Sequence, residues 1–389
     1  MLTITLTHHP HARKELFLDR TLRVISRSGL NLTENALVEQ LPTIAQTLGS
    51  CLFLGGRTSA LAQAVWLRGQ GEAYQLHTFD AHTARILQRN LDDNQAPKAL
   101  FHVSAESDLH AFAKASTVFW QMTKGDGTAE LQLNMLETLC EDSAPQGRRF
   151  FIASDALNET FLKRVKKYCD KVTLKKFGDK KTGEVTVLFA TLAHPILRTE
   201  QSTHSAEFEI SLKGHEPIKL MTLPGCFCHR RADMGGLALT EVVAEQVAFD
   251  DGDWIMDMGC GCGMDGLLLA TAFPEKKLHV TYQDSNVCAR DAVMENLRRY
   301  PHAGEVLFSD EGLGEPNRYD LFLANPPYFG DWRIAEFFIE TASRVLKRGG
   351  MIAFISKREV QPTELLTAAH FEVLNTFSRR GYTVLLARK

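Results

Sequence analysis

The sequence lacks any long apolar run: no stretch of its 389 residues approaches the roughly 20 apolar residues that a membrane-spanning helix needs. It also lacks the pattern of a signal peptide, because the chain turns polar soon after residues 1–7. An excess of one charge sign is missing too, since the formal net charge is only −3. The first two absences predict a cytoplasmic protein without a membrane partner. A net charge close to zero is not typical of a protein that binds nucleic acid.

The eight cysteines show no pattern of a disulfide framework or a zinc site. Without a secretion signal they are expected to be free thiols in a reducing compartment. The pairs Cys226-x-Cys228 and Cys260-x-Cys262 lack the usual zinc spacing, and the second pair lies inside a glycine loop. We therefore predict no bound metal. The chain is long enough for two domains, each with a hydrophobic core of its own.

Predicted strands and helices alternate along the chain, which is typical of α/β proteins with a mostly parallel sheet. In the second half we expect helices from about residue 265, over 287–299 and over 334–346, the last stopped by Gly349 and Gly350. The expected strands cover residues 254–258, 278–283, 305–308, 320–324 and 351–356, and a closing hairpin covers 371–377 and 382–387.

An internal repeat appears when the chain is shifted against itself by 204 residues. Matching positions then follow in one order: residues 51–55 over 255–259, Asp80 over Asp284, Glu106 over Asp310, Gln121 over Asn325 and, with a small drift, 186–190 over 383–387. We predict two tandem Rossmann-like domains, residues 1–195 and 218–389, joined by a linker over 196–217.

The two copies differ in the residues that follow their first strand. The first copy has bulky or polar side chains where the second has an acid and two glycines: Phe53, Arg57 and Ser59 stand in place of Asp257, Gly261 and Gly263. The first domain is therefore predicted to be degenerate, retained for binding or for supporting its partner.

A cofactor site is predicted where Asp257, Gly259, Gly261 and Gly263 alternate with other residues between a buried strand and a helix. Glycine lets the backbone turn sharply and approach a ligand, which in open α/β sheets lies beyond the carboxyl ends of the strands. A glycine loop alone also fits a dinucleotide site or a helix cap.

Acids at the next two strand ends favour a nucleoside-containing cofactor. Asp284 ends the second strand and can accept hydrogen bonds from both ribose hydroxyls. Asp310, preceded by Ser309, follows the third strand and can accept from an adenine amino group. Strand-end aspartates also cap turns, but their combination with the three glycines favours a cofactor.

The most specific motif is Asn325, Pro326, Pro327 and Tyr328, directly after the strand 320–324. The prolines fix the backbone and remove two N–H donors. The Asn325 side-chain oxygen and the Pro326 carbonyl can then accept hydrogen bonds from one planar amine, while Tyr328 can stack on a flat substrate. We predict that these four residues are catalytic, without a metal or a covalent nucleophile.

This motif resembles that of the amino-group methyltransferases, and the two-copy layout resembles the bacterial ribosomal RNA guanine-N2 methyltransferases. Residues 223–227 (LPGCF) and 233–235 (DMG) match that family's segment before the glycine loop. The resemblance implies a class I fold with a degenerate N-terminal domain and S-adenosylmethionine as cofactor, with Phe227 beside the cofactor pocket. It also implies a monomer whose partner is ribosomal RNA or a ribosomal subunit. Tyr328 departs from the family's usual Phe and is commoner in adenine-N6 and protein glutamine-N5 methyltransferases.

Other functions remain open on the sequence. The chain could be a protein glutamine-N5 methyltransferase acting on a release factor, a non-catalytic RNA-binding or ribosome-assembly factor, or a small-molecule methyltransferase. Residues 163–181 hold nine Lys or Arg against two Asp, which can grip phosphates or form a solvated face. Further cations near predicted loops could contact RNA: Arg230, Arg231, Arg333, Lys357, Arg358, Arg379 and Arg380.

Overall fold

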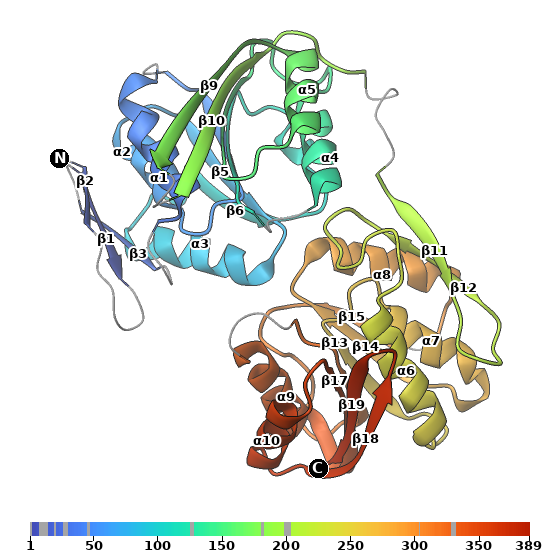
Figure 1. The fold of residues 1–389 in the computed structure, drawn as a ribbon. Helices are drawn as coiled ribbons and strands as arrows, with labels where there is room; N and C mark the ends of the chain where they lie inside the picture. The colour runs from blue at the N-terminus through green and yellow to red at the C-terminus, as the bar shows by residue number, and fades with distance from the viewer. Residues whose placement is uncertain are drawn as a thin grey trace. The chain divides into compact units, whose positions relative to one another are not determined.

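The computed structural model describes residues 2–7, 15–18, 21–25, 30–44, 47–124, 128–179, 183–197, 204–302, 304–327 and 332–389 (Figure 1). The chain divides into two compact units, Met1–His204 and Ser205–Lys389. The predicted linker 196–217 contains this division, but it also contains β11 (Ala206–Ile210), which pairs with β12 (Ile218–Thr222) in the second unit. The polar composition hides this strand because its alternate residues are exposed.

The N-terminal unit is built on a seven-stranded sheet in the order β6-β5-β4-β7-β8-β10-β9. Its strands are β4 (Ser50–Leu54), β5 (Ala73–Thr78), β6 (Phe101–Ala105), β7 (Thr117–Met122), β8 (Arg149–Ser154), β9 (Cys169–Asp179) and β10 (Gly183–Leu192). Its helices are α1 (Leu32–Gln40), η1 (Leu41–Thr43), α2 (Ala60–Leu67), α3 (Ala81–Asp93), η2 (His110–Phe112), α4 (Ala129–Leu139) and α5 (Glu159–Tyr168). A small sheet precedes them: β1 (Leu2–Thr7), β2 (Glu15–Leu18) and β3 (Thr21–Ile25).

The C-terminal unit repeats this topology in the order β15-β14-β13-β16-β17-β19-β18. Its strands are β13 (Trp254–Met258), β14 (His279–Asp284), β15 (Gly304–Phe308), β16 (Tyr319–Ala324), β17 (Leu346–Ser356), β18 (Glu372–Arg379) and β19 (Tyr382–Arg388). Its helices are α6 (Met234–Gln246), α7 (Met264–Ala272), η4 (Pro274–Lys276), α8 (Val287–Arg299), α9 (Arg333–Val345) and α10 (Val360–Ala368). The predicted α/β fold of two tandem copies is confirmed.

Strand register corrects part of the predicted repeat. Leu54 pairs with His77 and Met258 pairs with Gln283, so Asp284 corresponds to Thr78 and not to Asp80. Asp80 instead caps α3, as Asn286 caps α8. The prediction failed because the segment between the first two strands is two residues longer in the second copy, which a single shift of 204 misses.

The same register moves the third match by one residue. Thr78 pairs with Ala105 and Asp284 pairs with Phe308, so Glu106 corresponds to Ser309 and not to Asp310. The match of Gln121 to Asn325 is confirmed. Trp120, just before Gln121, pairs with Leu54, and Ala324, just before Asn325, pairs with Met258. Leu54 and Met258 are equivalent positions in the two sheets.

The end of α9 also differs from the prediction. The helix ends at Val345, and Leu346 is already extended with φ −66° and ψ 143°. Gly349 and Gly350 therefore lie inside β17 and do not stop the helix. The pairing register with β16 shifts here, because the chain passes from Tyr319↔Leu346 to Leu321↔Met351.

The remaining elements position the site. The strand β13, the helix α8 and the closing hairpin of β18 and β19 are found where they were predicted. Parallel β13, β14, β15 and β16 carry their carboxyl ends to one edge of the sheet. Within the described ranges, no helix has the length and apolar character to cross a membrane.

Candidate active site

The glycine loop after β13 turns sharply at one edge of the C-terminal sheet. Gly259, Gly261 and Gly263 have φ angles of +70°, +55° and +81°. A Cβ on Gly261 would meet no protein atom within 4 Å, so packing against protein does not explain this glycine. Its conformation and its open surroundings allow a ligand to approach the backbone closely.

Asp284 at the end of β14 holds this loop in place. Its Oδ2 accepts a hydrogen bond from the Gly261 N–H at 3.0 Å, and its Oδ1 accepts from the Asn286 N–H at 2.8 Å. A carboxylate has about four lone-pair positions and can accept several hydrogen bonds at once, ribose hydroxyls included. The structure thus adds a loop-bracing contact to the predicted ribose-binding role.

Asp257 lies beneath the loop and is only 3% exposed. Its Oδ2 accepts from the Gly266 N–H at 3.0 Å in the first turn of α7. Burial, and next the charge of Asp284, raise the pKa of Asp257 to about 7, while the Gly266 hydrogen bond lowers it. This carboxyl therefore supports the loop from the inside.

Asp265 is a buried carboxyl that the sequence interpretation missed. It is 8% exposed, and its Oδ1 has no hydrogen-bond partner among the described residues. Burial, followed by the charges of Asp257 and Asp233, raises the pKa of Asp265 well above its ordinary value. An acid among the apolar residues of α7 was the available signal.

Four carboxyl groups gather around the loop: Asp233, Asp257, Asp265 and Asp284. Each feels the charge of at least one of the others, as the raised pKa values of Asp257 and Asp265 show. Such a concentration of acids disfavours a negative ligand and stabilises a positive one. The site is therefore suited to a cationic cofactor.

Asn325 follows β16, and Asp233 fixes the direction of its amide. The Asn325 Nδ2 donates to the Asp233 Oδ2 at 2.6 Å. Asp233 is itself held as the N-cap of α6, where it accepts from the N–H groups of Gly235 and Gly236. An ionised carboxylate only accepts, so the Asn325 Oδ1 is left facing away as an acceptor for a substrate amine.

Pro326 is buried and Pro327 is exposed, so the motif passes from the core to the surface within two residues. Pro326 and Pro327 line a small hollow together with Trp332 and Phe354. The fourth predicted catalytic residue, Tyr328, lies outside the described residues.

The other predicted cofactor residues lie around the same edge. The Ser309 N–H donates to the Asp284 carbonyl at 3.1 Å, and its Oγ accepts from the Glu311 N–H at 3.0 Å. Asp310 follows directly and is half-buried. Phe227 lies in the turn before α6 and is 72% exposed.

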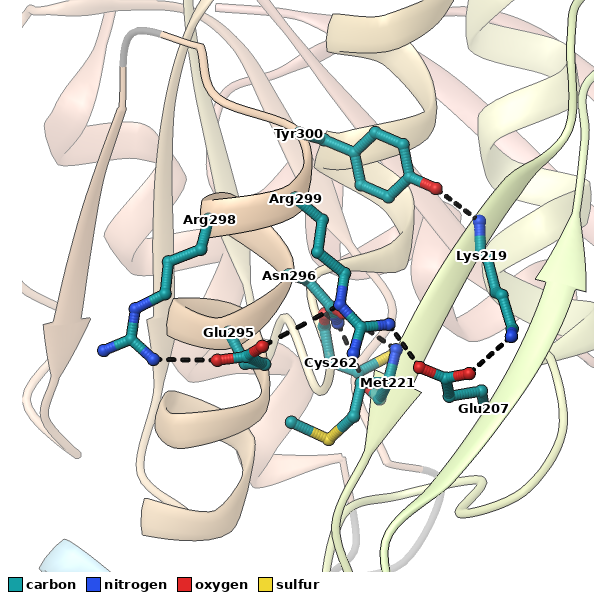
Figure 2. A network of polar contacts seen from close by, with 9 residues as sticks. All are labelled: Glu207, Lys219, Met221, Cys262, Glu295, Asn296, Arg298, Arg299 and Tyr300. Carbon is teal, nitrogen blue, oxygen red and sulfur yellow. Dashed lines mark hydrogen bonds and ion pairs between the residues drawn. The ribbon is translucent and has the colours of Figure 1, made fainter.

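Asn296 fastens the β11–β12 hairpin to the glycine loop (Figure 2). Its buried amide donates to the Met221 carbonyl at 2.9 Å and to the Cys262 carbonyl at 3.0 Å, and accepts from the Met221 N–H at 2.8 Å. Around it, Glu207 on β11 pairs with Lys219 and Arg299. Sequence interpretation gave Asn296 no role, because its partners are backbone groups.

The corresponding edge of the N-terminal unit is filled by its own side chains. Phe53, in the place of Asp257, stacks on Phe119 with centroids 5.1 Å apart. A Cβ on Gly55 would lie 2.1 Å from the Gln121 carbonyl oxygen, so the loop packs directly on the next strand end. The first copy has Phe53 and Thr78 where the second has Asp257 and Asp284, and its own buried acid, Glu34, accepts hydrogen bonds from the Thr58 hydroxyl and the Leu61 N–H.

Two of the cations predicted to contact RNA are engaged by acids of α6. Arg379 and Arg380 each make two hydrogen bonds, to Glu245 and Glu241 respectively. Lys357 lies over the Tyr382 ring at 5.5 Å.

The cysteines near the glycine loop are free thiols, and burial raises the pKa of Cys260 and Cys262.

Comparison with known proteins agrees with this geometry. Residues 217–386 match the family described as Methyltransferase small domain. Ribosomal RNA small subunit methyltransferase C from Hahella chejuensis is 28% identical over 41% of this chain, and the match spans 46% of that relative's length. The protein of the same name from Proteus mirabilis is 24% identical over 78% of this chain and 83% of its own.

A solved structure extends the likeness to both units. The T. thermophilus 16S rRNA N2 methyltransferase, in complex with AdoMet and guanosine, superposes with a TM-score of 0.75 over 98% of this chain and 96% of its own, at 18% identity. The predictions of tandem class I methyltransferase folds and of a methyltransferase are confirmed.

Proposed function

We propose that the chain transfers a methyl group from S-adenosylmethionine to the exocyclic N2 amine of a guanine in ribosomal RNA. The observation that carries the proposal is the Asn325 amide, held by Asp233 so that its Oδ1 is left as an acceptor beside the glycine loop. The matching relatives are named as small-subunit ribosomal RNA methyltransferases, which favours small-subunit RNA as the substrate.

The residues of the site fit the cofactor. Asp257 and Asp265, whose Oδ1 has no hydrogen-bond partner among the described residues, can ionise beside a cation that carries an ammonium and a sulfonium group. The Gly261 backbone is open to a ligand, and the Asp284 carboxylate beside it can accept hydrogen bonds from ribose hydroxyls. When bound, the cofactor supplies an activated methyl group on sulfur.

The protein's part in the reaction is positioning and electrostatics. The Asn325 Oδ1 and the Pro326 carbonyl accept the two amine hydrogens and hold the nitrogen lone pair toward the methyl carbon. The bound cofactor would supply the methyl group, and the amine nitrogen held by these two acceptors would release one proton to solvent. A guanine in folded RNA has to be exposed or flipped out to reach this site.

The finer assignments follow from the same proposal. The acceptor would be free small-subunit RNA or a particle that contains it, and the chain would work as a monomer in the cytoplasm. The N-terminal domain, whose strand ends are filled by Phe53 and Gln121, would bind RNA or support the catalytic domain. Light scattering with and without RNA tests the monomer.

Tritiated S-adenosylmethionine tests the function with unmodified small-subunit RNA and particles, the large-subunit equivalents and release factors as acceptors. We expect label in small-subunit RNA that digests to N2-methylguanosine. Label only in release factors would contradict the proposal in favour of glutamine-N5 methylation, which the sequence Asn–Pro–Pro–Tyr also fits. The matched control is Asn325→Ala, which should lower the rate of labelling by about 100- to 1,000-fold with every acceptor.

A further inference from the structure

A second cavity lies in the N-terminal unit, on the face of its sheet formed by β8, β10 and β9. Its volume is about 470 Å³, within the range of roughly 300–1,000 Å³ usual for ligand pockets. The 3-10 helix η1 forms the opposite wall through Thr43 and the adjoining Ile44. The reaction proposed above uses none of the residues that line this cavity.

The floor of the cavity is aromatic because of the strand register. Phe189 on β10 pairs with Phe151 on β8 and with Thr173 on β9, so the three side chains form a row on one face. The two rings meet edge to face at 5.4 Å and 84°. This row offers a flat planar group an apolar surface for ring contacts.

Two cations stand at the cavity, and both are anchored by neutral groups. The Arg149 guanidinium donates to the Thr47 carbonyl at 2.8 Å and to the Thr117 hydroxyl at 3.2 Å. The Lys175 ammonium donates to the Gln40 amide oxygen at 3.1 Å. Neither cation has a carboxylate partner among the described residues, so their positive charge is not neutralised locally.

Other members of the basic segment 163–181 differ in this respect. Lys176 pairs with Glu184 at 2.7 Å, and Arg164 pairs with Glu137 at 3.2 Å. The segment itself divides between α5 and the edge strand β9, and Lys180 and Lys181 lie outside the described residues. Lys175 is its basic residue at the cavity, beside a neutral wall and an aromatic floor.

We propose that this cavity binds one unpaired nucleotide of the RNA, with the base against Phe151 and Phe189 and the phosphate held by Arg149 and Lys175. The combination of an apolar floor and two uncompensated cations matches a planar ring linked to an anion. The inference rests on the proposed RNA substrate, and it assigns the degenerate domain a docking site of its own. Lysines also protect exposed edge strands from aggregation, which is the competing explanation.

The test compares two adjacent lysines of β9 in the full chain. The probe is a fluorescein-labelled single-stranded RNA, and its anisotropy gives Kd at several salt concentrations. Lys175→Ala should weaken binding and reduce the salt slope by about 1, the loss of one phosphate contact. Lys176→Ala removes the same charge from a lysine already paired with Glu184, and should leave the slope unchanged.

A third variant tests the shape of the site. Thr43→Trp places a bulky ring in the cavity without changing charge, and should weaken RNA binding at all salt concentrations. Melting temperatures and S-adenosylmethionine affinity should match the wild type in all three variants. Equal effects of Lys175→Ala and Lys176→Ala, or wild-type RNA binding by Thr43→Trp, would overturn the nucleotide site.

The docking site and the proposed reaction can fail separately. If no RNA accepts label but Lys175→Ala still weakens RNA binding selectively, the docking site stands and the reaction is wrong. If Lys175→Ala and Thr43→Trp methylate RNA with wild-type KM, the reaction stands and the docking site is wrong.

Discussion

Asn325 is a residue whose chemistry depends on which way its amide faces. An amide offers one acceptor and one donor group of similar shape, and only the acceptor can hold the hydrogens of a substrate amine. The hydrogen bond to Asp233 at 2.6 Å settles the choice, because an ionised carboxylate cannot donate. At the scale of residues, the proposed reaction therefore depends on a pair, in which Asn325 would contact the substrate and Asp233 would orient it.

Asn325→Ala should lower kcat by about 100- to 1,000-fold, as the loss of a positioned polar group commonly does. The cofactor is held by the glycine loop and the acids, so its affinity should change little. Rates with tritiated S-adenosylmethionine and calorimetric titration measure the two quantities. Parallel loss of both would remove Asn325 from its assigned role.

Asp233→Ser separates positioning from folding. Serine is a good N-cap, so α6 should stay as stable as in the wild type. Its shorter side chain does not reach Asn325 as the carboxylate does, and kcat should fall by about tenfold or more with little change in KM. An unchanged kcat at wild-type melting temperature would show that Asp233 does not orient the amide.

Asp257 should link cofactor binding to pH. Its pKa of about 7 is raised by burial, so the folded protein binds a proton that the unfolded chain releases at lower pH. This carboxyl therefore makes the free energy of unfolding fall as pH rises from about 4 to 7. A cationic cofactor favours the ionised form, so affinity should rise with pH through about 7.

Calorimetry in two buffers of different ionisation enthalpy should detect proton release on S-adenosylmethionine binding near pH 6.5. Asp257→Asn is the control, because its side chain keeps the shape and cannot titrate. Wild-type protein that releases no proton, or a variant that releases as much, would contradict this linkage.

At the scale of elements, the glycine loop depends on neighbours far along the chain. β14 supplies Asp284, and α8 supplies Asn296, whose amide joins the loop to β12. The loop has one internal backbone hydrogen bond, from the Gly263 N–H to the Cys260 carbonyl, and its other backbone groups depend on these outside partners.

Asn296→Ala should lower the free energy of unfolding by about 2–4 kcal/mol, because the buried Asn296 amide makes three hydrogen bonds to backbone groups that would lose their partner. S-adenosylmethionine should also bind more weakly and restore part of the lost melting temperature. The control is Arg298→Ala on the same helix, whose exposed pair with Glu295 is worth at most about 1 kcal/mol. Equal destabilisation by both variants would argue against the role of Asn296.

At the scale of the whole molecule, one architecture appears twice and only one copy keeps an open strand edge. The seven strands follow the same order in both sheets, so the fold does not distinguish the copies. Phe53 and the close approach of Gly55 to Gln121 fill the first edge, whereas acids and an open Gly261 line the second. A fold persists when its core is kept, while a site is lost with a few side chains.

Calorimetry should therefore find one S-adenosylmethionine bound per full chain. Asp284→Ala should weaken that single event by removing the ribose acceptor and the brace on Gly261. Two binding events, or one that Asp284→Ala leaves unchanged, would contradict the assignment of the site to the C-terminal unit.

The sequence by itself determined the elements and the residue types of the site. Strand and helix periodicity is local, so β13 and α8 were predicted at their observed bounds, and the order of motifs placed Asp284 and Asn325 among the predicted site residues. A single shift could not follow length changes between strands, which is why Asp80 was matched to the wrong residue.

Only the tertiary structure decided which side chains meet. Asp233 and Asn325 are 92 positions apart, and nothing local to either predicts their hydrogen bond. The same holds for Asn296, whose partners are carbonyl and N–H groups that every residue carries, and for Asp265, whose raised pKa comes from burial. Contacts over such separations depend on how the elements pack, and packing is a property of the folded chain.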